Sequence, residues 1–440
     1  MPPELLFESL PNTWEPTSLG EACKRGGGDI QTGPFGSQLH AADYVSQGIP
    51  SIMPQNIGDN RISENGIARI TPEDAKRLTR YLVQTGDIVY SRRGDVELRS
   101  LIREHENGWL CGTGCLRVRF GNDIDPLFAS YYLGHPVVRE WIVRHAHGAT
   151  MPNLNTSILS EVPFVIPPQI EQRAIARILG SLDDKIELNR KMNQTLEAMA
   201  RAIFKSWFVD FNPVRAKVEG RDPGLPRDLS ALFPDSFEDS ELGEIPKGWE
   251  IKTVADLAEL NSWTLSKSDD LDRIEYVEIS EVSRGDIGTI QVFLRGQEPS
   301  RARRRLRHGD TVLSTVRPDR GSYFLCLQPA PCLIASTGFA VFTPTTAPWS
   351  LIHAALTQPD LFEQLGHLAD GGAYPAVRPE VIGQRQLPWP DKLAIAEAFH
   401  RICGPLYKKA EQNRHESRTL VAMRDALLSK LLSGEIRVKA

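Results

Sequence analysis

The sequence predicts an α+β protein in which two similar mixed α/β domains are separated by two long helices that pair as an antiparallel coiled coil. Three observations predict this fold class. Residues 170–207 place seam positions at alternating spacings of four and three, which is the pattern of a helix that lies along another helix. The same spacing returns 224 residues later. The stretches that precede the two helices also resemble each other in the order of their motifs.

The first predicted domain covers residues 12–168. Short apolar runs that follow turn residues are typical of strands. In residues 116–120, apolar residues alternate with Arg117 and Arg119, so we expect a half-buried strand with both arginines on one exposed face. The other expected elements are strands in residues 49–53, 86–90 and 162–166 and helices in residues 127–133 and 137–145.

The first helical arm is predicted in residues 169–212, because Pro213 cannot continue a helix. Residues 213–247 are rich in proline, glycine and acidic residues, which indicates a linker. The second domain is predicted in residues 248–390 and the second arm in residues 391–436.

The second domain repeats the first. Residues 309–314 match residues 86–91 at an offset of 223, and Thr337 and Gly338 match Thr113 and Gly114 at an offset of 224. Chance similarity would not keep this register to the end of the second helix. We therefore infer an internal duplication.

Matching seam positions define the expected helix–helix interface. Asn189 and Asn413 fall at the same point of the two seams. A polar residue inside an apolar interface fixes register at a cost in stability, although a solvent-exposed role is equally compatible with the sequence. The predicted interface residues are Ile175, Leu179, Leu182, Ile186, Asn189, Leu196 and Ile203 in the first arm and Leu406, Asn413, Leu420 and Leu427 in the second.

Composition is ordinary for a globular protein, with 41% hydrophobic and 24% charged residues over 440 positions, enough for two to four domains. No apolar run approaches the eighteen residues of a membrane span, so we expect no membrane association. Residues 1–10 lack the basic region of a secretion signal, and the six cysteines show no disulfide spacing. We therefore expect a cytoplasmic protein.

Charge is distributed unevenly along the chain. The net charge is −5, but residues 295–320 contain eight arginines against three acidic residues, a local charge of +5. A patch of one sign can guide an anionic partner even on a slightly acidic molecule.

Motifs for catalysis are mostly absent from the sequence. It contains neither a Gly-x-x-x-x-Gly-Lys phosphate loop nor an Asn/Asp-Pro-Pro-aromatic string for methyl transfer; Asn212 and Pro213 are the nearest approach. Cys111 and Cys115 near His105 could be imagined around zinc, but no second ligand pair follows and a core strand is favoured. We predict no catalytic residue and no metal site.

Basic and amide side chains near strand ends are candidates for DNA contact. Arginine binds phosphates and guanine edges bidentately, and such readers are usually mounted on loops of a rigid sheet. A solvated arginine-rich surface is the alternative, but clusters at corresponding places of duplicated domains favour nucleic acid. The predicted DNA-binding residues are Gln38, His40, Gln55, Asn56, Arg92, Arg93, Arg301, Arg303, Arg304, Arg305, Arg317 and Arg320.

The two arms are long enough to separate two reading domains. Antiparallel helices with seams of about 33 residues span roughly 50 Å, whereas two DNA half-sites one turn apart are separated by about 34 Å. A single chain with two unequal domains would read an asymmetric, two-part sequence.

Four strings of the sequence are typical of a known family: residues 33–39 (GPFGSQL), 167–175 (PPQIEQRAI), 182–190 (LDDKIELNR) and 202–211 (AIFKSWFVDF). With these strings, and in its domain–helix–domain–helix order over nearly the whole length, the chain resembles the specificity (S) subunits of type I restriction-modification systems.

The resemblance implies two target-recognition domains, each of which binds one half of a bipartite site in double-stranded DNA. The helices would set the spacer and dock two methyltransferase (modification) subunits, and restriction subunits would join through them in a defence against foreign DNA. S-adenosylmethionine would then belong to the methyltransferase partner, and ATP and Mg to the restriction partner. This chain itself would hold no cofactor.

The second copy departs from the family pattern. Residues 393–398 lack the Glu-Gln-Arg string, and the second domain lacks Gly-Pro-Phe-Gly, so loop roles do not transfer to it residue by residue. Two other functions stay open: a self-contained DNA methyltransferase or nuclease, and a coiled-coil assembly scaffold whose basic patches are incidental.

Overall fold

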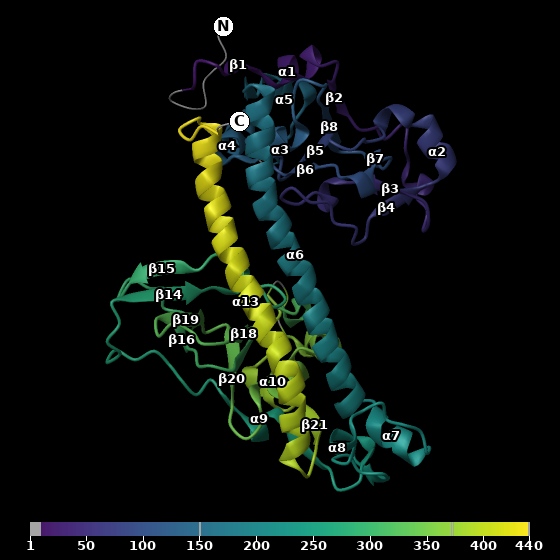
Figure 1. The fold of residues 1–440 in the computed structure, drawn as a ribbon, viewed down its shortest axis with the longest axis vertical. Coiled ribbons are helices and arrows are strands. Elements are labelled where there is room, and N and C mark those ends of the chain that lie inside the picture. The colour runs from purple at the N-terminus through teal and green to yellow at the C-terminus, as the bar shows by residue number, and fades with distance from the viewer. Residues whose placement is uncertain (1–9, 149–150, 371, 373, 439–440) are drawn as a thin grey trace. The chain divides into compact units, whose positions relative to one another are not determined.

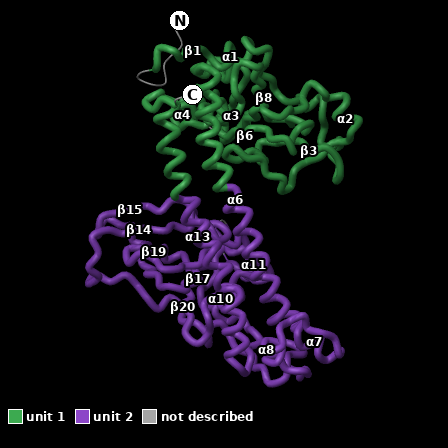
Figure 2. The backbone as a smooth tube through the Cα atoms, viewed as in Figure 1, with its two compact units in different colours: residues 1–186, 419–440 green, residues 187–418 purple. Residues whose placement is uncertain are grey.

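The computed structural model describes residues 10–148, 151–370, 372 and 374–438. The chain divides into two compact units (Figure 2): residues 1–186 with 419–440 form unit 1, and residues 187–418 form unit 2. Each unit contains one mixed α/β domain and a part of each long helix.

The sheets of unit 1 are short and mostly antiparallel. Four strands lie in the order β2-β8-β5-β6, and three in the order β4-β3-β7, where β3 and β7 are parallel. Strand β1 pairs with β9 and joins the two ends of the domain. The strands are β1 (Glu15–Ser18), β2 (Asp29–Thr32), β3 (Ile49–Ile52), β4 (Ala68–Ile70), β5 (Ile88–Ser91), β6 (Arg99–Leu101), β7 (Leu110–Cys111), β8 (Cys115–Arg119) and β9 (Pro163–Ile166).

Helices cover the four-stranded sheet of unit 1 and build its core. Phe128, Tyr132 and Phe164 are fully buried and contact one another through their rings. Polar residues cap these helices; the Asp125 carboxylate, for example, accepts the first free N–H groups of α3, as is common at helix N-termini. The helices are α1 (Leu19–Arg25), α2 (Pro72–Arg77), α3 (Pro126–Gly134), α4 (Pro136–His145) and α5 (Thr156–Glu161).

Unit 2 repeats the topology of unit 1. Its four-stranded sheet has the order β13-β20-β17-β18, its second sheet the order β15-β14-β19-β16, and β12 pairs with β21. Strands β14 and β19 are parallel, like β3 and β7. The strands are β12 (Glu250–Thr253), β13 (Ala258–Leu260), β14 (Arg273–Val277), β15 (Gln291–Leu294), β16 (Ala302–Arg305), β17 (Asp310–Ser314), β18 (Tyr323–Cys326), β19 (Leu333–Ser336), β20 (Phe339–Pro344) and β21 (Gln386–Trp389), and the helices are α9 (Val254–Leu257), α10 (Trp349–Leu356), α11 (Pro359–Leu368) and α12 (Pro379–Gly383).

The predicted fold class is confirmed. The four-stranded sheets β2-β8-β5-β6 and β13-β20-β17-β18 have corresponding orders, and both second sheets contain a parallel pair, although unit 2 adds the strand β16. The duplication inferred from sequence offsets is therefore also present in the structure. The expected strands correspond to β3, β5, β8 and β9, and the expected helices to α3 and α4.

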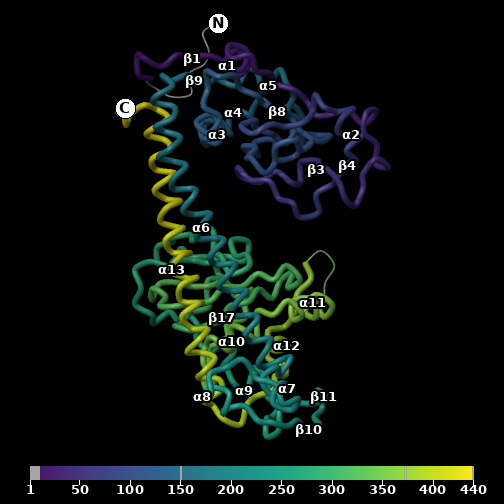
Figure 3. The backbone as a smooth tube through the Cα atoms, turned by 45° about the vertical axis from the view of Figure 1, so that its right-hand side comes forward, coloured from purple at the N-terminus to yellow at the C-terminus, as the bar shows by residue number. Residues whose placement is uncertain are grey.

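Two long helices complete the fold, α6 (Gln169–Phe208) and α13 (Leu393–Leu432). In unit 2 they pair antiparallel. The amide of Asn189 donates to Ser417 Oγ at 3.3 Å, that of Asn413 to Asn193 Oδ1 at 2.9 Å, and the ring of Phe204 meets Phe399. In unit 1, Arg424 Nη1 lies 2.8 Å from Asp183 Oδ1. Figures 1 and 3 show the two helices side by side.

The seam residues are shielded from solvent along both helices. Ile175, Leu179, Asn189 and Asn413 are buried. The seam residues that remain half-buried are Leu182, Ile186, Leu196, Ile203, Leu406, Leu420 and Leu427.

The segment that follows α6 is more structured than a linker composition suggests. It forms α7 (Asn212–Val218), α8 (Arg227–Ser230) and a hairpin of β10 (Phe237–Ser240) and β11 (Gly243–Pro246). Pro213 stands in the first turn of α7, where a missing N–H costs nothing. Phe233 packs edge-on against Trp207 at 5.2 Å between ring centroids, so apolar residues scattered among the acids anchor this segment to the core of unit 2.

The alternation in residues 116–120 predicts that Arg117 and Arg119 lie on an exposed face of β8. This prediction is wrong. Arg117 is buried and donates to Asp29 Oδ1 at 2.6 Å and to Gln31 Oε1 at 3.0 Å. Arg119 is half-buried and binds Asp87 through two nitrogens. Carboxylates on neighbouring segments pair with both guanidinium groups. The arginines can therefore be shielded from water without leaving an unpaired charge.

Candidate nucleic-acid interface

In unit 1, several loops gather around the turn of residues 112–114 between β7 and β8. The N–H of Arg92 donates to the carbonyl of Gly114 at 2.8 Å. A Cβ on Gly33 would lie 2.1 Å from the carbonyl oxygen of Gly112, and one on Gly114 would touch Pro54. We call residues 33–38, 53–56, 92–94, 112–114 and 151–154 the first loop cluster.

Backbone hydrogen bonds tie the loop of residues 92–94 to the loop of residues 151–154. The N–H of Leu154 donates to the carbonyl of Arg92 at 2.9 Å, and that of Gly94 to Pro152 at 3.2 Å. Arg93 and Asn153 form an isolated β-bridge. The loop after β5 is therefore held on a rigid frame, as recognition loops usually are.

Unit 2 builds a second loop cluster in the same way, from Arg301 and residues 279–281, 315–320, 337–338 and 374–377. The N–H of Thr315 donates to the carbonyl of Gly338 at 3.0 Å, and that of Val377 to Thr315 at 2.9 Å. Val316 and Ala376 form the bridge that Arg93 and Asn153 form in the first domain. The two clusters thus share a backbone frame.

Exposed side chains in the two clusters differ in chemistry. The first cluster exposes Phe35, Gln55, Arg93 and Met151. The second exposes Arg301, Asp319, Arg320 and Tyr374, with Arg317 half-buried. Both sets combine cationic, polar and large apolar groups, which suits phosphates together with base edges and faces.

The predicted residues of the first domain divide into two groups. Gln55 and Arg93 are exposed in the first loop cluster, and Arg92 is half-buried there with no hydrogen-bond partner for its Nε among the described residues. His40 is exposed after this cluster, and its backbone N–H donates to Asp43.

The prediction for Asn56 requires a correction, whereas Gln38 is half-buried and is held in its loop through its side-chain oxygen. Asn56 is buried, accepts from the Met53 N–H at 3.0 Å and donates to the Ser63 carbonyl at 3.0 Å. The Gln38 oxygen accepts from the Phe35 N–H and from Tyr81 Oη. These side chains stabilise the loops in which they lie. The sequence could not predict these hydrogen bonds, because they depend on the path of the backbone in each loop.

The arginine cluster of the second domain is spread over two places. Arg301 lies at the second loop cluster, where its carbonyl accepts from the N–H of Thr337 at 2.8 Å. Arg303, Arg304 and Arg305 lie on the edge strand β16, which runs away from that turn. All three are half-buried.

Much of the positive charge on β16 is used within the protein. Arg305 Nη1 lies 2.5 Å from Asp269 Oδ1, and its guanidinium stacks 3.8 Å from the ring centroid of Trp263. Burial lowers the pKa of Arg304. The local charge of +5 therefore overstates what this strand offers to an anionic partner.

The structure gives no support to the zinc alternative. Burial raises the pKa of Cys111 to about 12 and raises that of Cys115 well above its usual value, which disfavours the thiolate that zinc binds. His105 stands edge-on to Trp109. Among the residues that the structure describes, no group of three or more His, Cys, Asp or Glu is placed to hold a metal ion.

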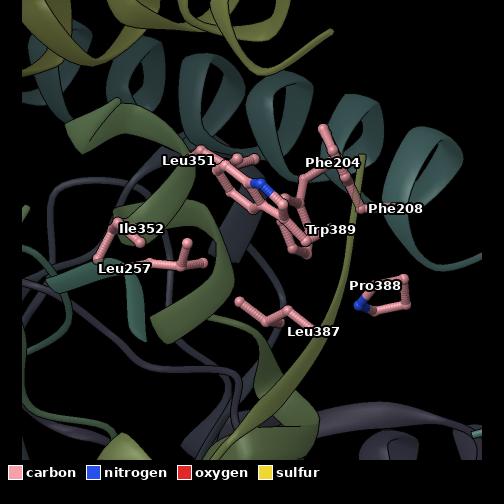
Figure 4. A pocket seen from close by; sticks show the side chains of 8 residues that line it. All are labelled: Phe204, Phe208, Leu257, Leu351, Ile352, Leu387, Pro388 and Trp389. Carbon is pink, nitrogen blue, oxygen red and sulfur yellow. The ribbon is translucent and has the colours of Figure 1, made fainter. Parts of the chain in front are cut away.

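A small pocket in unit 2 is part of the core. Figure 4 shows its lining: Phe204, Phe208, Leu257, Leu351, Ile352, Leu387, Pro388 and Trp389. None of these eight side chains carries a charge, so the pocket offers no cationic side chain to the carboxylate of a methyl donor. Within the described ranges, no helix has both the length and the apolar content of a membrane span.

Sequence reasoning missed Met151 and Tyr374, which are exposed at corresponding positions of the two loop clusters. Their correspondence could have been predicted from the sequence, because Met151 directly precedes Pro152 and Tyr374 directly precedes the matching Pro375. An apolar residue in a loop is easily taken for core, and only the structure shows that these side chains face solvent.

Comparisons with known proteins agree with this architecture. Residues 11–198 match the family model of the type I restriction modification DNA specificity domain. The chain is 26% identical to the type I restriction enzyme HindI specificity subunit of Haemophilus influenzae, over 88% of this chain and 95% of that protein. It is 22% identical to the MjaIX specificity subunit of Methanocaldococcus jannaschii, over 98% and 95%.

A solved structure has the same fold. The S subunit of a type I restriction-modification system from M. genitalium superposes with a TM-score of 0.56 at 18% identity, over 98% of this chain and 99% of that chain. Taken with the duplicated domains and the paired helices, these likenesses show a type I restriction modification DNA specificity domain in residues 11–198 and a similarity to type I specificity subunits over nearly the whole chain.

Proposed function

We propose that the two domains each read one half of an asymmetric bipartite site in double-stranded DNA. The observation that carries this proposal is that the two loop clusters share a backbone frame but differ in their side chains. Arg93 in the first cluster stands where Val316 stands in the second, and Gly94 where Arg317 stands. Equal frames would meet DNA in the same way, whereas unequal side chains would select different bases.

The paired helices would set the spacer between the half-sites. α6 and α13 have 40 residues each, so each is roughly 60 Å long at about 1.5 Å per residue. That length exceeds the roughly 34 Å between half-sites one helical turn apart. The buried asparagines of the seam would fix the register of the two helices and with it the spacer.

The helices would also dock two copies of one partner, a methyltransferase subunit. Thr195, Ala198, Met199 and Ala202 are exposed on α6, and the residues 224 positions later, Thr419, Ala422, Met423 and Ala426, are identical and exposed on α13. Solvent-facing positions have no packing reason to agree between copies. Their agreement, with small residues that permit close helix approach and a methionine that adapts to a partner, favours the same partner on each.

The chemistry would lie in the partners. S-adenosylmethionine would be held by the methyltransferase subunits, and ATP and Mg by restriction subunits that join the complex. This chain would supply only recognition and spacing, which fits a sequence without a methyl-transfer or phosphate-loop motif.

Mapping of methylated adenines in cellular DNA tests the proposal. DNA from cells that express the chain with its methyltransferase partner should show modification at one bipartite motif with a fixed spacer, and DNA from cells without the chain should not. Purified chain with labelled S-adenosylmethionine and DNA should transfer no methyl group until the partner is added.

The two alternatives give other results. A self-contained methyltransferase would label DNA without the partner. A coiled-coil scaffold would leave the methylation motif unchanged when Arg93 is replaced by alanine, whereas a reader should lose selectivity at one half of the motif only.

A further inference from the structure

The second loop cluster contains a backbone conformation that its residue disfavours. Arg317 has φ +48°, in the left-handed region. At the corresponding position, 223 residues earlier, the first domain has Gly94 with φ +76°. Glycine adopts this region freely, but a side chain with a Cβ is strained there. The positive φ that both domains share at this position favours glycine, but the second domain has arginine there.

The surroundings of Arg317 hold it in that conformation. Its backbone N–H donates to the carbonyl of Pro375 at 2.7 Å, and its guanidinium lies 5.2 Å from the ring centroid of Tyr374. Pro318 follows directly and begins the 3-10 helix η6 (Pro318–Arg320). Strained residues persist where neighbouring contacts over-determine them, and they cluster at functional sites.

Tyr374 offers an open aromatic surface beside this cation. Its side chain is 74% exposed, an unusual environment for a large ring in a loop pinned by the bridge between Asp370 and Ala376. The corresponding residue of the first domain is Met151, which is 62% exposed. A large side chain therefore projects from the same loop of both domains, and the second domain places Arg317 beside it where the first domain has Gly94.

The charged groups around the pair include both signs. Arg301 and Arg320 are exposed in the same loop cluster, and the carboxylates nearest in sequence are Asp319 and Asp370. Glu281 of the same cluster, which accepts from the N–H of Thr289 at 2.9 Å, brings the carboxylates to the same number as the arginines, so the group that offers a site to an anion is the guanidinium of Arg317 beside Tyr374. Single nucleotide steps present this combination of a negative phosphate and a base face.

We propose that Arg317 and Tyr374 form one composite DNA contact of the second domain, in which the tyrosine ring stacks against a base at a deformed step and the guanidinium binds the adjacent phosphate. The inference rests on the proposed function, because it requires that the second loop cluster faces DNA. The first domain would make an apolar contact with Met151 at the equivalent step but would lack the arginine. The strain at Arg317 is then retained for recognition.

Three variants and a control test the composite contact, each as the full chain in complex with its methyltransferase partner. Arg317→Gly restores the residue that the frame favours, and Tyr374→Ala removes the ring. Tyr374→Phe keeps the stacking surface. Arg273→Ala removes an exposed arginine of the same domain that pairs with Glu275 at the start of β14, away from the loop cluster.

Binding is measured by fluorescence anisotropy on duplexes that carry the mapped site intact or with either half scrambled. Arg317→Gly and Tyr374→Ala should each weaken binding to the intact site by about 5- to 100-fold and abolish the penalty for scrambling one particular half. Tyr374→Phe and Arg273→Ala should bind like the parent. The melting temperature of Arg317→Gly should equal or exceed that of the parent, because the strain is relieved.

The outcomes separate the two proposals. If the parent complex does not distinguish the intact site from the scrambled ones, the proposed function fails. If the parent distinguishes them and either Arg317→Gly or Tyr374→Ala binds like the parent, the composite contact is wrong. Loss of binding by Arg317→Gly together with a fall in melting temperature would show a structural role and would also overturn it.

Discussion

Individual side chains decide which part of a loop cluster is frame and which part can face a partner. Asn56 and Gln55 are neighbours in the 3-10 helix η2 (Pro54–Asn56), yet Asn56 is buried with two hydrogen bonds and Gln55 is exposed. The sequence identified both as amides near a strand end. It could not separate them, because the path of the backbone determines which amide points inward.

Replacement of these two residues should therefore have opposite consequences. Asn56→Ala should destabilise unit 1 by about 1–3 kcal/mol, since it leaves a buried N–H and a carbonyl without their partners. Gln55→Ala should change the free energy of unfolding by less than about 0.5 kcal/mol. Chemical denaturation of the two variants measures both values, and equal effects would contradict the assigned roles.

One buried histidine gives unit 2 a pH dependence. Burial lowers the pKa of His353 from 6.5 to about 3, and the nearby positive charges of Arg414 and Arg201 act in the same direction. The ring lies 3.4 Å from Thr311 Oγ1 through Nδ1 and stands edge-on to Tyr407. In the native state it is therefore neutral at neutral pH.

The sign of the effect follows from proton binding. Between pH 6.5 and about 3 the unfolded chain binds a proton at His353 that the native state does not, so this contribution to stability is present above pH 6.5 and is lost as the pH falls. His353→Gln should show a shallower decline of melting temperature over this range. An unchanged slope would show that His353 is not the group responsible.

At the scale of elements, the paired helices were the part most open to prediction. The residues of their interface can be predicted from the spacing of apolar residues along one helix. That spacing is a local property of the sequence and requires no knowledge of distant segments. The sequence did not reveal the polar contacts that attach a domain to the helices. Arg414 on α13 is 8% exposed and binds Glu197 on α6, Asp286 in the second domain and Glu411.

The duplication supplies a matched control for this network. The residue 224 positions before Arg414 is Arg190, which is 44% exposed and pairs with Glu187. Arg414→Ala should destabilise unit 2 by about 3–5 kcal/mol, because the half-buried carboxylate of Glu197 would lose its cation. Arg190→Ala should cost less than about 1 kcal/mol. Urea denaturation of the two variants compares them directly, and similar losses would contradict a buried network.

At the scale of the whole molecule, the sequence predicted the duplication because a constant offset of 223 to 224 survives across two diverged copies. It did not predict the pairing of β16 with β19, the buried arginines of β8 or the structure of residues 213–247. Those features depend on contacts between segments far apart in the chain. The sequence predicted several basic and amide residues of the loop clusters but not Met151 and Tyr374, because these two side chains carry no charge.

The central claim is that each domain reads its own half of the site and that the chain contributes no chemistry. Its most direct test replaces the second domain, residues 249–389, by a second copy of the first, residues 14–166, and maps methylated adenines in cells that also express the methyltransferase partner. Modification at a site whose two halves have the same base sequence, equal to one half of the original motif, is the expected result. An unchanged asymmetric motif would contradict the claim.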